Sequence, residues 1–513
     1  MNNHSNKPTI GILPQQESLR RELPTVIGNV DYTLFEHDLK TMDEVILRSG
    51  IETLFVELSL ERYVAQGRAD GMEAGGKALE RHQRHSRGAL RCTVLRHLLG
   101  VSFRDLSMQL AQSELLQWFC RIENFGVVQV PSKSTLQAYA HWLEEEAMTA
   151  VLDQLKAAAS HTQADGSCPV GLDNALELDV VWADSTALKA TIHFPVDWVL
   201  LRDGARTLLK AMALIRKHGL RHRMEEPAAF LTRMNQLCMA MSAARRQSDS
   251  KKQRKKVLRM MKRLLKAIEG HAWRYHQLLD EQWRQTDWTR LQAEVVLQRI
   301  QGVLDQLPQA IKQAHERIIG ERQVANKEKI LSLYEGDVHV IVRGKAGAEV
   351  EFGNSLFLAE QCDGFIVDHE LSRHASPGDG QWLAQRIDKM APQGDPAKLS
   401  GVFSDRGFAS KRNTAMLEAD EIFDGLCPRD PKELSRKMKD EVFAAGQKRR
   451  AQTEARVSIL KNVFLDGGKP RAKGFAHRQI AVQWAVLAHN LRVVSRMRQR
   501  EQEAKDAEKR LTG

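Results

Sequence analysis

The stretch Glu177-Leu-Asp-Val-Val-Trp-Ala-Asp184 joins a short apolar run to a carboxylate. A near-continuous apolar run of this length predicts a strand that is buried on both faces, which is typical of α/β folds. We therefore expect a central core strand that delivers Asp184 to its C-terminal end. An isolated aspartate after a strand is most often a turn residue or a helix cap, so Asp184 needs further acids beside it to indicate a site.

Two further acids occur downstream in comparable surroundings. Asp405 ends a second apolar run, which predicts another core strand, and Glu454 lies in a helical segment near the C-terminus. On an α-helix, residues four and seven positions apart share a face, so Arg450 and Lys461 would flank Glu454. Taken alone, this row is an ordinary ladder of helical ion pairs, worth about 0.3 to 0.5 kcal/mol per pair. Taken with Asp184 and Asp405, it indicates three carboxylates that could share a divalent metal.

These motifs resemble those of the DDE transposases of bacterial insertion sequences, in the group with a Tyr-Arg-Glu-Lys signature on its last catalytic helix. Arg450, Glu454 and Lys461 keep the spacing of that signature, while Gln447 stands in the tyrosine position. The resemblance extends roughly from residue 75 to residue 494. It implies an α/β fold with a ribonuclease H-like mixed-sheet catalytic core, a helical N-terminal domain and a large all-helical insertion.

The resemblance implies that Asp184, Asp405 and Glu454 are both the catalytic residues and the metal ligands. Carboxylate oxygens suit Mg²⁺, or Mn²⁺ in its place, far better than thiolate or imidazole groups do. A pair of such ions activates water or a DNA 3′-hydroxyl and stabilises the leaving oxygen of a phosphodiester substitution. The cofactor expected from this set of ligands is therefore Mg²⁺.

The polar residues of the same helix are expected to bind the DNA strand near the cleavage point. Arg450 offers a planar fork to a phosphate, and Lys461 offers a compact charge. Gln447 can hydrogen-bond a phosphate or a base, but it lacks the ring with which a tyrosine would stack.

A second set of candidate DNA-binding residues lies in a strongly basic run. Residues 245 to 266 contain eleven basic residues and one acid, a net charge of +10 that nearly equals the +11 of the whole chain. Leucines and methionines at positions 258, 261, 264 and 265 predict an apolar stripe opposite the charges. Such a run is either a solvated helix face or a DNA contact, and we favour the second. The residues of this run that we expect to bind DNA are Lys251, Lys252, Arg254, Lys255 and Lys256.

The chain is expected to divide into five parts. They are an N-terminal segment (1–74), a helical, DNA-binding domain (75–155), a catalytic core in two pieces (172–202 and 327–494), a basic helical insertion (203–326) and a charged tail (495–513). Alternating apolar residues between positions 337 and 371 predict an antiparallel meander within the core. In the helical domain, Arg91, Arg96 and Arg104 are either phosphate contacts or members of a bundle that only supports the core.

The composition favours a polyanionic partner and argues against a membrane protein. The pI is near 9.3, which suits nucleic acid. No apolar stretch reaches the roughly 20 residues of a membrane span, and the N-terminus lacks the apolar core of a signal peptide, so a cytoplasmic protein is expected. The six cysteines are scattered without metal-ligand spacing, which indicates reduced thiols rather than zinc ligands.

The function implied by the resemblance is that of a DNA transposase. Such a protein would bind the terminal inverted repeats of its own element, cleave the ends and join them to target DNA, acting as a homodimer on double-stranded DNA. Two alternatives stay open: a catalytically inactive, transposase-derived DNA-binding protein, and a metal-dependent DNA nuclease without strand transfer. Metal-dependent nicking and the joining of 3′-hydroxyl ends distinguish the three functions.

Overall fold

The apolar run that contains Trp182 lies in the central strand of a mixed sheet. The structure, a computed structural model, describes residues 22–69, 75–124, 127–244, 248–345, 348–394, 398–468 and 470–512. Within these residues the sheet consists of six strands: β3 (Val180–Lys189), β4 (His339–Lys345), β5 (Ala348–Glu360), β6 (Ile366–Leu371), β7 (Gly401–Ser404) and β8 (Phe423–Leu426). β3 pairs antiparallel with β5 and parallel with β7, and β8 extends the sheet in parallel with β7. The predicted α/β class with a mixed sheet is therefore confirmed.

The predicted meander corresponds to strands β4, β5 and β6. β4 and β6 both pair antiparallel with β5, along different stretches of it. β5 is long enough for both pairings because it has 13 residues. Apolar and polar residues alternate only over 348–352, and 356–359 is a continuous apolar run in the buried part of the strand.

The prediction that Asp184 ends its strand was wrong. β3 continues for five residues beyond it, to Lys189, because this stretch stays paired with β5, from Asp184 opposite Leu358 to Lys189 opposite Gly353. The shorter β7 ends at Ser404, which pairs with Ala183. Asp184 therefore lies in the middle of β3 but at the level where its neighbour β7 stops.

One face of the sheet is covered by helix α15 (Glu441–Ile459). Trp182 stacks on Phe403 of β7 with ring centroids 5.2 Å apart, and its indole nitrogen donates to the carbonyl oxygen of Gly446 at 2.9 Å. A side chain at Gly446 would collide with the Phe403 ring. The glycine therefore lets the helix lie close against the sheet.

The opposite face is covered by helix α12 (Asp379–Met390). Trp382 of this helix stacks on Phe357 of β5, with ring centroids 5.6 Å apart. Side chains alternate between the two faces of a strand, so neighbouring residues of β3 face different helices. Trp182 faces α15, and Ser185 faces α12.

A helical unit precedes the sheet and begins earlier than the sequence indicated. It comprises α1 (Val30–Arg48), α2 (Ile51–Ala69), α3 (Gly76–Leu99), α4 (Phe103–Gln112), α5 (Glu114–Cys120), α6 (Lys133–Tyr139) and α7 (Glu145–Ser160), with a short hairpin, β1 (Glu123–Asn124) and β2 (Val127–Val128). Helices α1 and α2 pack against α3, α5 and α7, so they belong to this unit and not to a separate segment.

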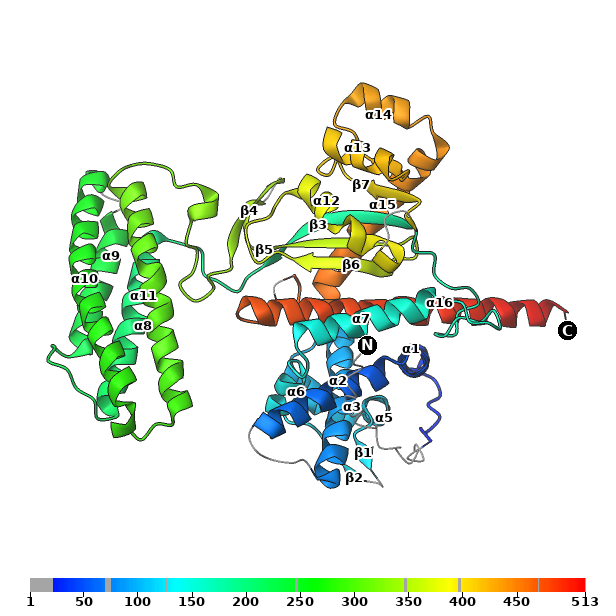
Figure 1. Ribbon diagram of the computed structural model, residues 1–513, viewed down its shortest axis with the longest axis horizontal. Helices are drawn as coiled ribbons and strands as arrows, with labels where there is room; N and C mark the ends of the chain where they lie inside the picture. The colour runs from blue at the N-terminus through cyan, green and yellow to red at the C-terminus, as the bar shows by residue number, and fades with distance from the viewer. Residues whose placement is uncertain are drawn as a thin grey trace, which may run out of the picture.

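The C-terminal tail is helical, because it continues α16 (Phe475–Thr512) without a break. Figure 1 shows α16, in red, running between the helical unit and the sheet. It packs on α1, α3 and α7 on one side and on β6 on the other. The remaining short elements are α13 (Lys411–Ala419), α14 (Pro431–Lys437), η1 (Trp283–Gln285), η2 (Asn326–Glu328), η3 (Pro392–Gly394) and the π-helical turn η5 (Leu460–Phe464).

The basic insertion is an antiparallel bundle of four helices within the described residues. They are α8 (Asp197–Lys217), α9 (Pro227–Ala244), α10 (Ser250–Gln282) and α11 (Arg290–Ile318). The bundle has its own apolar core, separate from that of the sheet and the helical unit. Figure 1 shows it standing beside the sheet, joined to β3 and β4 by two linkers. In the part of the chain that is described, no helix is long and apolar enough to cross a membrane.

Candidate active site

Asp184 and Asp405 lie beside each other at the end of β7. Each follows, by two residues, one of the stacked aromatic rings Trp182 and Phe403, so both are expected on the face that α15 covers. An oxygen of the Asp184 carboxylate accepts a hydrogen bond from the backbone nitrogen of Ser185 at 2.7 Å. Asp405 likewise accepts from the backbone nitrogen of Gly407 at 2.8 Å. Backbone amides thus hold both carboxylates in fixed orientations.

Helix α15 brings the remaining predicted residues alongside β3. Its Gly446 contacts Trp182, and Lys461, just beyond its end, donates from Nζ to the hydroxyl of Thr186 at 3.1 Å. Trp182, Asp184 and Thr186 alternate onto one face of the strand. Arg450 and Glu454 lie between the two contacts, beside Asp184.

Lys461 reaches the strand from a π-helical turn. The sequence predicted Arg450, Glu454 and Lys461 on one α-helical face, but the chain widens into η5 from Leu460 onward. Turns of this kind often occur at functional sites because the extra residue re-aims the side chains around it. The backbone at Gly468 closes on the lysine, since a Cβ there would lie 3.0 Å from Lys461 Cε.

The acids act on one another electrostatically. The pKa of Asp184 is raised to about 6, mainly by burial and also by the charges of Asp405 and Glu454, while the Ser185 amide and Arg450 oppose the rise. A carboxylate charge raises the pKa of another acid only when it is close, so the contributions of Asp405 and Glu454 indicate that both lie near Asp184. A cation placed among them would be strongly attracted.

The carboxylate oxygens of the three acids suit a hard divalent cation, but the three side chains do not converge on a common position for a metal ion. Among the described residues, no group of three His, Cys, Asp or Glu side chains is placed to hold a metal ion. Glu454 accepts a hydrogen bond from Arg450 at 2.7 Å, and its side chain is 60% exposed. Asp184 and Asp405 would hold a metal first, and Glu454 would join them by turning away from Arg450.

Gln447, in the position of the signature tyrosine, is turned toward the sheet. Its amide nitrogen donates to the carbonyl oxygens of Ser404 at 3.2 Å and Gly425 at 2.6 Å. Both hydrogens of the amide are thus used to hold the ends of β7 and β8 together. Only the carbonyl oxygen is left for a ligand, and an oxygen acceptor cannot bind a phosphate directly.

A fourth acid, Asp379, lies next to the site and was missed from the sequence. One of its oxygens accepts from the hydroxyl of Ser185 at 2.6 Å. A Cβ added to Gly407 would collide with its other oxygen and lie 3.0 Å from an oxygen of Asp405, so the two carboxylates flank this glycine. Buried Asn413 fixes the arrangement by donating to the carbonyl oxygens of Gly380 and Phe408. In sequence, Asp379 resembles any acid in the first turn of a helix.

Two of the arginines proposed as phosphate contacts in the helical unit are structural. Arg91 is fully buried and donates to Glu52 at 2.6 Å and to Asp43 at 2.5 Å. Arg96 donates to both oxygens of Asp466, directly behind η5. The phosphate-contact interpretation is wrong for both residues, because their guanidinium groups are already held by internal acids, whereas Arg104 is exposed.

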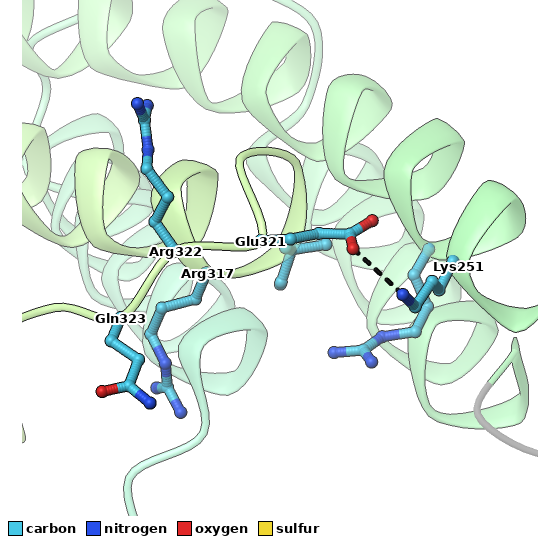
Figure 2. A pocket seen from close by; sticks show the side chains of 7 residues that line it. Lys251, Arg317, Glu321, Arg322 and Gln323 are labelled. Atoms are coloured by element: carbon cyan, nitrogen blue, oxygen red, sulfur yellow. Dashed lines mark hydrogen bonds and ion pairs between the residues drawn. The ribbon is translucent and has the colours of Figure 1, made fainter.

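The five basic residues of the insertion that were predicted to bind DNA differ in whether they have partners within the protein. Lys251 and Lys255 both pair with Glu321, at 3.0 and 2.7 Å, and Arg254 lies over the ring of Trp198. Figure 2 shows Lys251 turned toward Glu321 across an open pocket of about 310 Å³. The pocket is lined by Lys251, Arg254, Arg317, Ile318, Glu321, Arg322 and Gln323. Lys252 and Lys256 are exposed and do not line this pocket.

No family model, curated protein or solved structure matches this chain. The functional argument therefore depends on the geometry of the site. That geometry combines acids suited to divalent metals with an arginine and a lysine suited to phosphate, on adjoining elements of one sheet and one helix.

Proposed function

We propose that this protein is a DNA transposase with a ribonuclease H-like catalytic core. The observation that carries the proposal is the alignment of α15 with β3, which groups Asp184, Asp405 and Glu454 beside Arg450 and Lys461. The contributions of Asp405 and Glu454 to the raised pKa of Asp184 support the same grouping. Acids that share a site with phosphate-binding bases suit the displacement of one phosphodiester oxygen by another.

The topology supports the ribonuclease H-like assignment. A central strand carries the first acid, an antiparallel strand lies on one side of it, and a parallel strand that leads to the second acid lies on the other. The third acid comes from a helix packed on the same face. The helical bundle enters between the first and second acids, where it extends the molecule without interrupting the sheet.

In the proposed reaction, Asp184 and Asp405 hold Mg²⁺, or Mn²⁺ in its place, and Glu454 completes the site. Bound there, the metal would activate water or a 3′-hydroxyl and stabilise the leaving oxygen. When Glu454 turns to the other acids, the guanidinium of Arg450 is released to bind a phosphate in a bidentate manner. Lys461, fixed by Thr186, supplies a second positive charge on the same side.

The proposed substrates are the terminal inverted repeats of the protein's own element and a target duplex. Two ends must be held together during transposition, so we propose a homodimer on DNA, acting in the cytoplasm where bacterial DNA lies. The second candidate function is an inactive DNA-binding descendant of a transposase. It is favoured by the inward turn of Gln447 at the tyrosine position.

End cleavage by purified protein tests the proposal. With Mg²⁺ and a duplex that carries the element's end, the unchanged protein should cleave, whereas Asp184→Asn, Asp405→Asn and Glu454→Gln should bind the duplex but lose at least 100-fold in rate, on the order expected for lost metal ligands. Normal cleavage by any of these variants would contradict the proposal that the three acids are catalytic. Pre-cleaved 3′-hydroxyl ends then separate a transposase, which joins them to target DNA, from a nuclease, which does not.

A further inference from the structure

Helix α10 buries one face in the bundle. Its apolar residues Leu258, Met261, Leu265 and Ile268 are fully buried there, and they recur at the spacing of a single helical face. Helices α8, α9 and α11 pack on α10. The buried face fixes which side of α10 is turned outward.

The outward side of α10 carries a row of positive charges. Five exposed bases follow one another at intervals of four and three residues, and we call them the α10 stripe: Lys252, Lys256, Arg259, Arg263 and Lys266. At about 100° per residue they lie within an arc of about 80°, opposite the buried face, and span about 21 Å of helix. Five cations therefore form one continuous line on the surface.

The stripe contains no acid, and none of its members has an ion-pair partner among the residues that the structure describes. A solvated helix face normally mixes both signs, because like charges three or four residues apart repel. Asp249 is the N-cap residue of α10, and the first acid within the helix is Glu269. The repulsion within the stripe is therefore not relieved inside the described protein, which points to an external anion.

Three further bases of the same helix have partners inside the protein. Lys251 and Lys255 share Glu321, and Lys262 contacts His315 of α11. These residues lie between the buried face and the stripe. Helix α10 thus has one set of bases with partners in the bundle and another set that faces outward.

We propose that the α10 stripe binds the sugar-phosphate backbone of duplex DNA without reading its sequence. A line of bases about 21 Å long matches a backbone that presents about one charge per 1.7 Å of duplex axis. The stripe contains no aromatic ring, whereas sites for single strands use rings to stack bases. The proposal rests on the proposed function, since the bundle would bind a part of the DNA that lies at a distance from the cleavage point.

The experiment compares two neighbouring pairs of lysines. Lys252→Ala with Lys256→Ala removes two members of the stripe, and Lys251→Ala with Lys255→Ala removes two lysines of the same spacing that pair with Glu321. Binding of the full chain to a long duplex of arbitrary sequence is measured between about 50 and 200 mM salt. Thermal unfolding confirms that both double variants are folded.

The stripe pair should weaken binding by about tenfold or more near 0.1 M salt and lower the slope of log affinity against log salt by about 1.8, because each lost phosphate contact lowers it by about 0.9. The Lys251 and Lys255 pair should change the slope much less. Adding Arg259→Ala and Arg263→Ala to the stripe pair should roughly double the loss of slope. Equal effects of the two lysine pairs, or an effect seen with duplex RNA but not with duplex DNA, would overturn the proposal.

These results are separable from those on catalysis. If the stripe variants bind DNA like the unchanged protein and still cleave it in an Asp184-dependent manner, the proposal that the stripe binds DNA is wrong. The proposed catalytic function then stands. If the stripe variants lower the salt dependence of binding but the unchanged protein does not cleave DNA, the stripe binds DNA as proposed. The proposed catalytic function then fails.

Discussion

Asp184 combines an ionisable group with an environment that disfavours its charge. Its pKa is raised to about 6, first by burial and then by the neighbouring acids, whereas an unfolded aspartate titrates near 3.9. The folded protein therefore holds the proton more tightly than the unfolded chain does. Asp184 therefore contributes to the stability of the fold at pH values below about 4, and that contribution is lost as the pH rises through about 6.

Replacing Asp184 by asparagine should therefore stabilise the protein at neutral pH. We expect Asp184→Asn to raise the free energy of unfolding by about 1 to 3 kcal/mol at pH 7.5, because about two pKa units correspond to at most about 3 kcal/mol. Near pH 4 the difference should almost vanish. Urea unfolding of both proteins at the two pH values measures it, and a difference that is the same at both values would contradict the assigned pKa shift.

Gly407 lies between two carboxylates, which occupy the space that a side chain at this position would need. A methyl group there would meet both Asp379 and Asp405. We expect Gly407→Ala to destabilise the protein by about 1 to 3 kcal/mol, as overpacking does, and to reduce end cleavage at least tenfold by displacing Asp405. Gly380→Ala is the matched control, since its Cβ would have only ordinary contacts at 3.8 Å or more. Cleavage unchanged in both variants would mean that Asp405 does not need its present position.

Secondary-structure elements were easier to predict than the side chains that they bring together. The strand around Trp182 and the helix around Glu454 follow from apolar runs and helical periodicity, which are local properties. The extension of β3 past Asp184 depends on β5, more than 160 residues downstream, and no local pattern shows it. The π turn at Lys461 and the approach of Asp379 likewise depend on contacts between distant segments.

The contact between α3 and η5 is another long-range feature, and it supports the turn that carries Lys461. Arg96 donates to Asp466, and His97 bonds the carbonyl oxygen of Phe464 at 2.7 Å. Burial lowers the pKa of His97 to about 4, so this histidine is neutral at physiological pH. The helical unit therefore holds the end of the candidate active site through polar contacts.

Removal of the Arg96 side chain tests this support. Arg96→Ala should destabilise the protein by about 2 to 4 kcal/mol, because it leaves the largely buried carboxylate of Asp466 without its partner. Arg104→Ala, at an exposed arginine of the neighbouring helix, should change stability by less than about 0.5 kcal/mol. Thermal or urea unfolding measures both. If Arg96 were instead a phosphate contact, its loss would weaken DNA binding and leave the unfolding transition in place.

Among the described residues, the two largest apolar cores share no buried residue. One lies under the sheet and the helical unit and contains Val402, and the other lies within the bundle and contains Leu265. A third, small cluster lies in the segments that join the bundle to β3 and β4 and consists of Ala190, Leu331 and Val338. Separate cores joined by two linkers often unfold in separate steps. The sequence predicted a helical insertion over 203–326 because strand patterns are absent there, whereas the bundle already begins at Asp197 with α8.

We therefore expect two unfolding transitions that respond to different substitutions. Leu265→Ala should lower the transition of the bundle by about 2 to 5 kcal/mol, and Val402→Ala should lower that of the sheet by a similar or smaller amount, as losses of fully buried side chains do. Mg²⁺ should raise only the transition of the sheet, because a ligand stabilises the unit that binds it, and chelation should reverse the effect. Calorimetry of the full chain resolves the two transitions. If Leu265→Ala, Val402→Ala and Mg²⁺ all shifted one common transition, the bundle would be energetically part of the catalytic core, and DNA held by the α10 stripe would then be coupled directly to the acids around Asp184.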